Sequence, residues 1–147
     1  INYRNEPVEI IKTSKEVAGR RYGETRPVFV AISEKTFSAG EAIALQLRTY
    51  RHAVLVGHRT RGGAHGGNFF KLPNDLQIFV VTGKGEGHDW EGVGVPPDVE
   101  TTGAAAVGAA HRLAVQTVLD KTTDPKTAQV LRNVLDRRIE NLSSFAA

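Results

Sequence analysis

The segment PVFVAISEKTFSAGEAIALQLRTYRHAVLVG, residues 27–57, decides the fold. It opens with PVFVAI (27–32), a continuous apolar run rich in β-branched residues, which is typical of a buried strand. It closes with a second such run, AVLVG (53–57). Between them the pattern becomes helical, and we expect a helix from Ser38 to about Arg51. The segment therefore predicts a strand–helix–strand unit with parallel strands, the basis of an α/β fold.

The helix of this unit carries an apolar stripe that predicts which side faces the core. Its residues fall largely on one side of a helical projection: Ala42, Ile43, Leu45, Leu47 and Tyr50. We expect this side to pack against the two strands.

Further strand predictions lie outside this unit. VEIIKT (8–13) predicts a short strand before it. After a glycine-rich loop at residues 58–69, NFFKL (68–72) and LQIFVVT (76–82) flank a Pro-Asn-Asp turn and predict a β-hairpin. Residues 83–99 are rich in glycine, proline and acidic side chains, and they fit neither the helical nor the strand period.

The C-terminal part is helical by pattern. Residues 104–121 predict an alanine-rich helix, which TTDP (122–125) ends while it supplies the next N-cap. A final amphipathic helix is expected to run to about Leu142. Its apolar stripe either packs on the core or docks on a partner subunit.

Composition and charge exclude several classes of function. The 147 residues correspond to one domain, with ordinary shares of hydrophobic (40%) and charged (24%) residues. No apolar run approaches the roughly 18 residues that a membrane span requires. The chain has no cysteine, which excludes disulfides and a thiolate nucleophile. Its net charge of +3 is spread over mixed charges, so we expect no nucleic-acid partner, and no His/Asp cluster predicts a metal site.

The stretch TFSAGE (36–41) places a serine at the turn from strand to helix. Ser38 and Glu41 have the spacing of a capping box, which is a purely structural role. A hydroxyl at this place also lies near the positive end of the helix dipole, where free backbone N–H groups can bind an oxyanion. The small residues Ala39 and Gly40 would let a substrate backbone come close. These six residues contain no general base, so both roles stay open.

Two more motifs follow in order, and together the three motifs indicate a family. V-G-x-x-T-x-G-G-A spans residues 56–64, and W-E-G-x-G-V-x-P-D spans residues 90–98. With these motifs, roughly residues 1–120 resemble the tail-specific (C-terminal processing) serine peptidases. They look closest to the branch of the tricorn protease core and the interphotoreceptor retinoid-binding protein repeats. The resemblance implies an α/β fold, a ClpP/crotonase-like ββα spiral with C-terminal helices. It divides the chain into a C-terminal peptidase lobe (1–122) and an amphipathic helix (123–147).

The resemblance also implies roles for individual residues. Ser38 is expected to be the nucleophile, and Glu91 to support a histidine within a Ser–His–Glu arrangement. The backbone N–H of Ala39 is expected to bind the oxyanion. The glycine-rich loop is expected to contact the substrate through Gly62, Gly63 and Ala64.

The general base is the part of this site that the chain does not supply. In the processing-protease branch a lysine acts as base, but its place falls on Gly63, and Arg61 cannot substitute because a guanidinium stays protonated. In the tricorn-like branch the histidine lies far upstream, together with an Asp-Leu-Arg-x-Asn-x-Gly-Gly oxyanion segment. His65 is the nearest local stand-in, although a surface role is the simpler interpretation of the loop histidines His58, His65 and His88. The chain begins at Ile1 and has no methionine, so we expect a fragment or a processed product.

Two functions follow from this interpretation. The first is a serine endopeptidase, without cofactor, whose substrates are extended peptides or protein C-termini that bind beside the strands by β-addition. The alternative is a non-catalytic module that binds a lipophilic ligand or a peptide on the same scaffold. The expected protein partners are a second copy of the chain or the missing N-terminal half. Family members are often exported, although no signal peptide is visible here.

Overall fold

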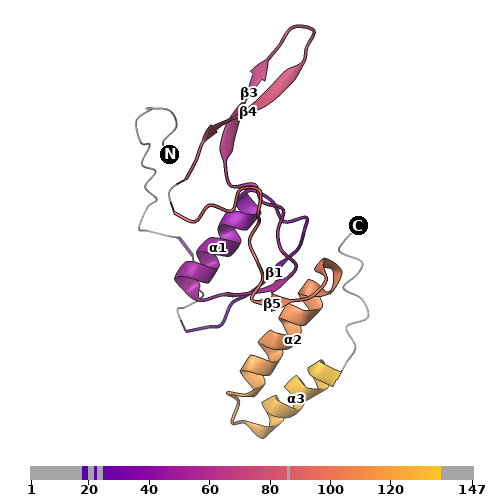
Figure 1. The fold of residues 1–147 in the computed structure, drawn as a ribbon. Helices are drawn as coiled ribbons and strands as arrows, with labels where there is room; N and C mark the ends of the chain where they lie inside the picture. Colours follow the sequence, from indigo (N-terminus) through magenta and orange to yellow (C-terminus); the bar gives the residue numbers. More distant parts are fainter. Residues whose placement is uncertain (1–17, 20–21, 23–24, 86, 137–147) are drawn as a thin grey trace.

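The structure is a computed structural model that describes residues 18–19, 22, 25–85 and 87–136 (Figure 1). The elements in order are β1 (Phe29–Ile32), α1 (Ala39–Arg51), β2 (Val54–Gly57), β3 (Gly66–Lys71), β4 (Gln77–Gly83), β5 (Val99–Glu100), the 3-10 helix η1 (Gly103–Ala105), α2 (Ala106–Leu119) and α3 (Pro125–Asp136). The strand expected at 8–13 and the end of the last helix beyond Asp136 lie outside the described residues.

The strand–helix–strand unit is confirmed. β1 and β2 are parallel, with Phe29 opposite Val54 and Ile32 opposite Gly57. The short β5 joins the other side of β2 in parallel, which gives the strand order β1-β2-β5. The carboxyl ends of β1 and β2 therefore lie at one edge of the sheet, the edge from which the chain continues towards Ser38 and the glycine-rich loop.

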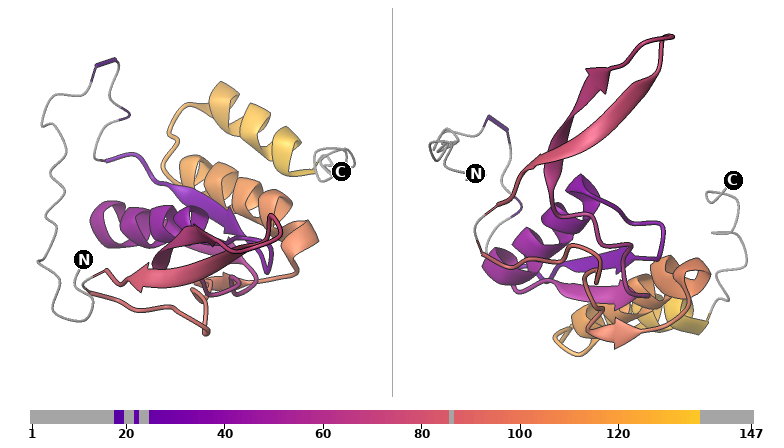
Figure 2. Two further views of the ribbon diagram at one scale, coloured as in Figure 1. Left: turned by 90° about the horizontal axis from the view of Figure 1, so that it is seen from above. Right: turned by 45° about the horizontal axis from the view of Figure 1, so that its top comes forward.

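Helices cover both faces of this sheet, with α1 on one side and α2 on the other (Figures 1 and 2). The main hydrophobic cluster lies where α1 meets the sheet and consists of Ile32, Ala44, Leu45, Leu55 and Val95. The predicted stripe of α1 is partly wrong, because Ile43 is 56% exposed and Tyr50 is 78% exposed. The side that faces the core instead includes Glu41, whose exposure is 0%. An acidic side chain thus occupies a position that a hydrophobic count alone would not assign to the interior.

The predicted hairpin is confirmed and projects from the rest of the molecule (Figure 1; Figure 2, right). β3 and β4 are antiparallel and pair Phe69 with Phe79. Asn74 and Asp75 both have positive φ (61° and 57°), the backbone conformation that matches the twist of a tight hairpin.

The last helix packs on the chain itself. Asp124 accepts the backbone N–H of Thr127 (2.8 Å) at the start of α3. Hydrogen bonding to Thr127 lowers the pKa of this carboxyl. α3 lies against α2, and Arg112 of α2 donates to the carbonyl of Leu135 (3.1 Å). The described part of this helix packs on α2, while Val130 of its predicted apolar stripe is 60% exposed. None of the described helices is long and apolar enough to cross a membrane.

Candidate active site

Ser38 stands where the chain leaves the β1 loop and enters α1. It is the N-cap of α1, it is exposed, and its φ is 52°. A positive φ is uncommon for a residue with a side chain, and such conformations occur at sites where the surrounding structure enforces them. Just inside the helix, the N–H of Ala39 has no acceptor among the residues that the structure describes. A hydroxyl and a free N–H therefore lie side by side at the positive end of a helix.

The conformation of Ser38 is fixed by Glu41. One carboxylate oxygen, Oε2, accepts the N–H of Ser38 (2.8 Å) and the N–H of Gly63 (2.8 Å). The other, Oε1, accepts the N–H of Gly62 (2.7 Å) and the hydroxyl of Thr60. The predicted capping contact to the Ser38 backbone is confirmed, and the same carboxylate also binds the glycine-rich loop.

Glu41 is buried as an anion. Burial alone would raise its pKa, but the hydrogen bonds from Thr60 and from the backbone N–H groups of Gly63, Gly62 and Ser38 outweigh it, so the pKa lies below its ordinary value. Sequence reasoning assigned Glu41 only to the helix cap. The available signal was Thr60 and the glycine pair in the next motif, which supply the donors that a buried carboxylate needs.

The third motif joins the first two through Thr60. Its hydroxyl donates to Glu41 and accepts the N–H of Val95 (2.7 Å). Gly92 also donates its N–H to the carbonyl of Gly62 (3.0 Å). Asp98, at the end of this motif, accepts the N–H of Leu55 (2.8 Å) and so fixes the motif to β2. The three sequence motifs thus meet around one buried carboxylate.

Glu91 holds the other half of the glycine-rich loop. Its Oε2 accepts the N–H of Ala64 (2.6 Å) and the N–H of His65 (2.9 Å). Its side chain is 39% exposed, in contrast to that of Glu41. The Nδ1 atom of the His65 ring lies 4.0 Å from the same oxygen. Glu91 therefore lies near a histidine, but this histidine belongs to the glycine-rich loop after β2.

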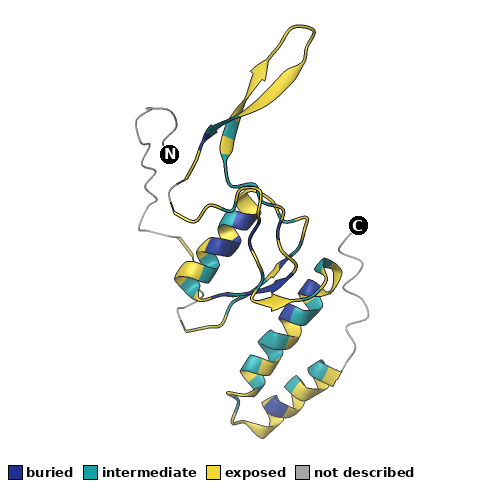
Figure 3. Ribbon diagram, viewed as in Figure 1, coloured by how far each residue is buried: buried dark blue, intermediate teal, exposed yellow. Residues whose placement is uncertain are grey.

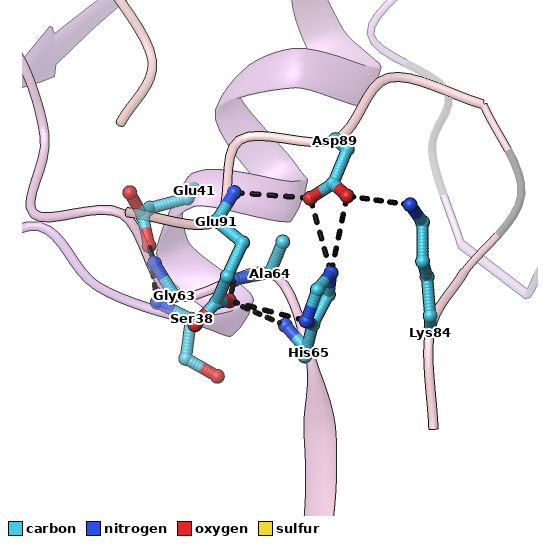
Figure 4. A network of polar contacts seen from close by, with 8 residues as sticks. All are labelled: Ser38, Glu41, Gly63, Ala64, His65, Lys84, Asp89 and Glu91. Carbon is cyan, nitrogen blue, oxygen red and sulfur yellow. Dashed lines mark hydrogen bonds and ion pairs between the residues drawn. The ribbon is translucent and has the colours of Figure 1, made fainter. Parts of the chain in front are cut away.

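Figure 4 shows a chain of polar contacts that continues from His65. The Nε2 atom of His65 lies 3.1 Å from each carboxylate oxygen of Asp89. Asp89 also pairs with Lys84 at 2.7 Å. The contacts with Lys84, the backbone N–H of Glu91 and His65 hold the pKa of Asp89 well below its usual range.

The Ser38 hydroxyl is not part of this network. In Figure 4 it points away from His65, Asp89 and Glu91. No hydrogen bond joins it to a histidine, lysine or carboxylate among the described residues. The same part of the chain contains no group of three or more His, Asp or Glu side chains that could hold a metal ion. Ser38 and Ala39 thus lie together at the start of α1, and no described residue stands beside the Ser38 hydroxyl as a general base.

The loop residues expected to contact substrate have their N–H groups occupied. Gly62 and Gly63 donate to Glu41, and Ala64 donates to Glu91. A Cβ atom at Gly63 would lie 2.2 Å from the ring of Phe37. The place of the processing-protease lysine is therefore filled by an aromatic ring.

Comparison with known proteins places the chain in a family. The sequence model of peptidase family S41 matches residues 2–101, which include all three motifs. The chain belongs to peptidase family S41. This confirms the family indicated by the motifs.

One sequence relative agrees with this assignment. The chain is 33% identical over 112 residues to a carboxyl-terminal-processing protease of Picosynechococcus sp., covering 71% of this chain and 27% of the relative. The chain thus spans about a quarter of the length of this S41 relative. It is similar to the crystal structure of mature CPAF (TM-score 0.50, 21% identity, 67% of this chain and 21% of that chain). A photosystem II D1 C-terminal processing protease matches with a TM-score of 0.47 and 24% identity, over 60% of this chain and 25% of that one.

Proposed function

We propose that this S41 chain is the C-terminal part of a serine peptidase catalytic domain, with Ser38 as its nucleophile. One observation carries the proposal: Ser38 is held at positive φ on the N-terminus of α1, beside the unoccupied N–H of Ala39. A merely structural N-cap needs neither a positive φ nor a free neighbouring donor. Both are what a nucleophile with an oxyanion site requires.

The proposed reaction is acyl transfer followed by hydrolysis. The Oγ of Ser38 attacks the peptide carbonyl carbon while its proton passes to a histidine from outside this chain. The carbonyl oxygen becomes an oxyanion that accepts the N–H of Ala39. The histidine then gives the proton to the leaving amine, and water hydrolyses the acyl-enzyme by the same sequence. Glu91 would orient that histidine, since its carboxylate is partly exposed and its Oε1 oxygen accepts no hydrogen bond from the described residues.

The histidine of this mechanism is not His65 in our proposal. The Nε2 atom of His65 already contacts Asp89, and its Nδ1 atom faces Glu91. A lysine base is also not expected, because the Phe37 ring fills the space beside Gly63. The chemistry therefore calls for a base from another part of the peptidase. The sheet and its helices would then be the last turns of a ClpP/crotonase-like ββα spiral.

An extended peptide is the substrate class that suits this geometry. β3 continues directly from the loop of residues 62–65, and its outer edge pairs with no described strand. A substrate strand could add to this edge through backbone hydrogen bonds. Gly62, Gly63 and Ala64 would contribute a wall of small residues, since their N–H groups are bound to carboxylates.

A second candidate function rests on an apolar hollow beside β1. The hollow has a volume of about 610 Å³ and lies between β1, α1 and α2. Its walls include Phe29, Leu47, Val107 and Ala110, with Arg51 and His111 as polar residues. This volume and lining suit a lipophilic ligand, which is the non-catalytic alternative.

Covalent labelling distinguishes the two functions. A phosphonate probe, applied to the peptidase that carries this segment, should modify Ser38 and stop peptide hydrolysis. Ser38→Ala should abolish both labelling and hydrolysis and should shift the melting temperature by only a few degrees, because a lost cap costs about 0.5–2 kcal/mol. Ser33→Ala, in the preceding loop, is the matched control and should keep both. Hydrolysis that survives Ser38→Ala would contradict the assignment. Binding of a fluorescent fatty acid that is lost on Val107→Asp would favour the second candidate.

A further inference from the structure

Asp89 joins both ends of the β3–β4 hairpin to the segment that carries Glu91. His65 immediately precedes β3, and Lys84 immediately follows β4. The Nε2 atom of His65 lies 3.1 Å from each carboxylate oxygen of Asp89, and the Nζ atom of Lys84 lies 2.7 Å from Oδ2. The backbone N–H of Glu91 donates to Oδ1 of the same carboxylate (3.1 Å). In Figure 4 the three groups meet at Asp89 from different directions.

The position of the hairpin depends on contacts at its two ends. The hairpin projects from the rest of the molecule (Figure 1), and in Figure 3 nearly all of it has the colour of exposed residues. Its strands pair with each other and with no other described strand. The contacts of Asp89 with His65 and Lys84 therefore hold the base of the hairpin next to the segment that carries Glu91.

Asp89 makes these contacts as an anion. Its contacts with Lys84, with the N–H of Glu91 and with His65 hold the pKa of its carboxyl well below the usual range. An ionised carboxylate can only accept hydrogen bonds, so the Nε2 atom of His65 carries the hydrogen between them. All three donors are thus bound by one ionised side chain.

The same contacts close a cycle with Glu91. The Oε2 atom of Glu91 accepts the N–H of Ala64 (2.6 Å) and the N–H of His65 (2.9 Å). Asp89 holds the backbone of Glu91 and the side chain of His65, while Glu91 holds the backbone of His65. Loss of Asp89 would open this cycle and let the loop and the carboxylate of Glu91 move apart.

The stretch between Lys84 and Asp89 adds little rigidity of its own. Gly85 and Gly87 lie in it, and glycine has the greatest backbone freedom of all residues. A Cβ atom at either glycine would meet nothing within 4 Å, so no described neighbour confines these positions on that side. A single exposed ion pair contributes little to stability, whereas several contacts that share one charged group contribute more. The segment therefore depends on the combined contacts of Asp89.

We propose that Asp89 is a positioning residue for Glu91. It keeps Oε2 of Glu91 on the N–H groups of Ala64 and His65, and so leaves Oε1 to orient the histidine that acts as base. Oε1 accepts no hydrogen bond from the described residues. The proposal rests on the proposed peptidase reaction, in which Glu91 orients that histidine. Asp89 contacts neither the substrate nor a reacting atom in that reaction and acts through Glu91.

Kinetics of the peptidase that carries this segment test the role. Asp89→Asn keeps the size of the side chain but removes its charge and one acceptor oxygen. It should lower kcat about tenfold and leave KM within about twofold, because Ser38 and the outer edge of β3 are unchanged. Asp75→Asn, at an exposed position in the turn of the same hairpin, is the matched control and should change neither. A wild-type kcat in Asp89→Asn would overturn the proposal.

A double-mutant cycle separates positioning from a general loss of structure. In a protein that already carries Glu91→Gln, Asp89→Asn should change kcat by less than about twofold, because the carboxylate that Asp89 positions is already absent. A further tenfold loss would show that Asp89 acts independently of Glu91, and it would overturn the proposal.

Amide hydrogen exchange measures the positioning without any need for activity. Asp89→Asn should speed the exchange of the Ala64 and His65 amides at least about tenfold. It should leave unchanged the exchange of the two amides that Glu41 binds in the same loop. Equal acceleration of all four amides, or of none, would overturn the proposal. A wild-type peptidase that hydrolyses no peptide would refute the proposed function, and exchange would still decide whether Asp89 positions Glu91.

Discussion

Two carboxylates hold the glycine-rich loop, and they do so in different ways. Glu41 accepts the N–H groups of Gly62 and Gly63, and Glu91 accepts those of Ala64 and His65. Four consecutive N–H groups are thus bound by two side chains. Glu41 is fully buried and comes from α1, whereas Glu91 is 39% exposed and comes from the irregular segment before β5.

The difference lies in how many oxygens each carboxylate uses. Both oxygens of Glu41 are engaged, each with two donors. The described hydrogen bonds of Glu91 all go to Oε2. A buried carboxylate with every acceptor engaged can only be structural, because it has nothing left to offer a substrate or a base. An exposed carboxylate with a free oxygen can hold the loop and also act on a histidine.

Amide substitution should distinguish the two carboxylates most clearly. In Glu41→Gln an NH₂ group faces N–H donors inside the core, so we expect a loss of about 3 kcal/mol in the free energy of unfolding. In Glu91→Gln the amide oxygen can still accept both N–H groups, so the melting temperature should change by only a few degrees. Urea unfolding of the two variants measures this difference. Equal losses would show that Glu91 is as structural as Glu41.

Alanine substitution at two glycines tests whether Thr60 fixes the position of the segment that carries Glu91. Gly92 and Gly94 both have positive φ, 69° and 72°, and alanine is strained at either place. A Cβ at Gly94 would lie 2.1 Å from the carbonyl oxygen of Thr60, whereas one at Gly92 meets nothing within 4 Å. Gly94→Ala should therefore cost about 2–3 kcal/mol, and Gly92→Ala about 1 kcal/mol, in thermal unfolding. Similar costs would mean that Thr60 does not fix the segment.

Acid unfolding should give the smallest difference between the Glu41 and Glu91 variants. The pKa of Glu41 is lower in the folded chain than its ordinary value of 4.5. The unfolded chain therefore takes up the proton first, and the stability that Glu41 provides is present above pH 4.5 and is lost as the pH falls below it. The melting temperature should be measured from about pH 6 downwards. It should fall less steeply with pH for Glu41→Gln than for Glu91→Gln. Parallel curves would contradict the role of Glu41 as a buried anion.

Much of the fold was predictable because its signals are local. Continuous apolar runs gave β1 and β2, and the Pro-Asn-Asp turn gave the hairpin. The direction in which α1 faces was predicted only in part. Ile43 and Tyr50 are exposed, whereas Glu41 is buried. Three of the four donors that make this burial favourable come from residues 60–63, and the fourth is the N–H of Ser38.

The sequence by itself determined the strand–helix–strand unit, the place of Ser38 at a helix start, and membership of family S41 through three ordered motifs. Only the tertiary structure decided that Glu41 binds the glycine-rich loop, that Phe37 fills the space beside Gly63, and that Glu91 reaches the loop at Ala64. The physical reason is that strand and helix patterns depend on neighbours along the chain. A buried carboxylate instead depends on N–H donors about twenty residues away in sequence. Such partners become neighbours only when the parallel strands bring the ends of β1 and β2 together.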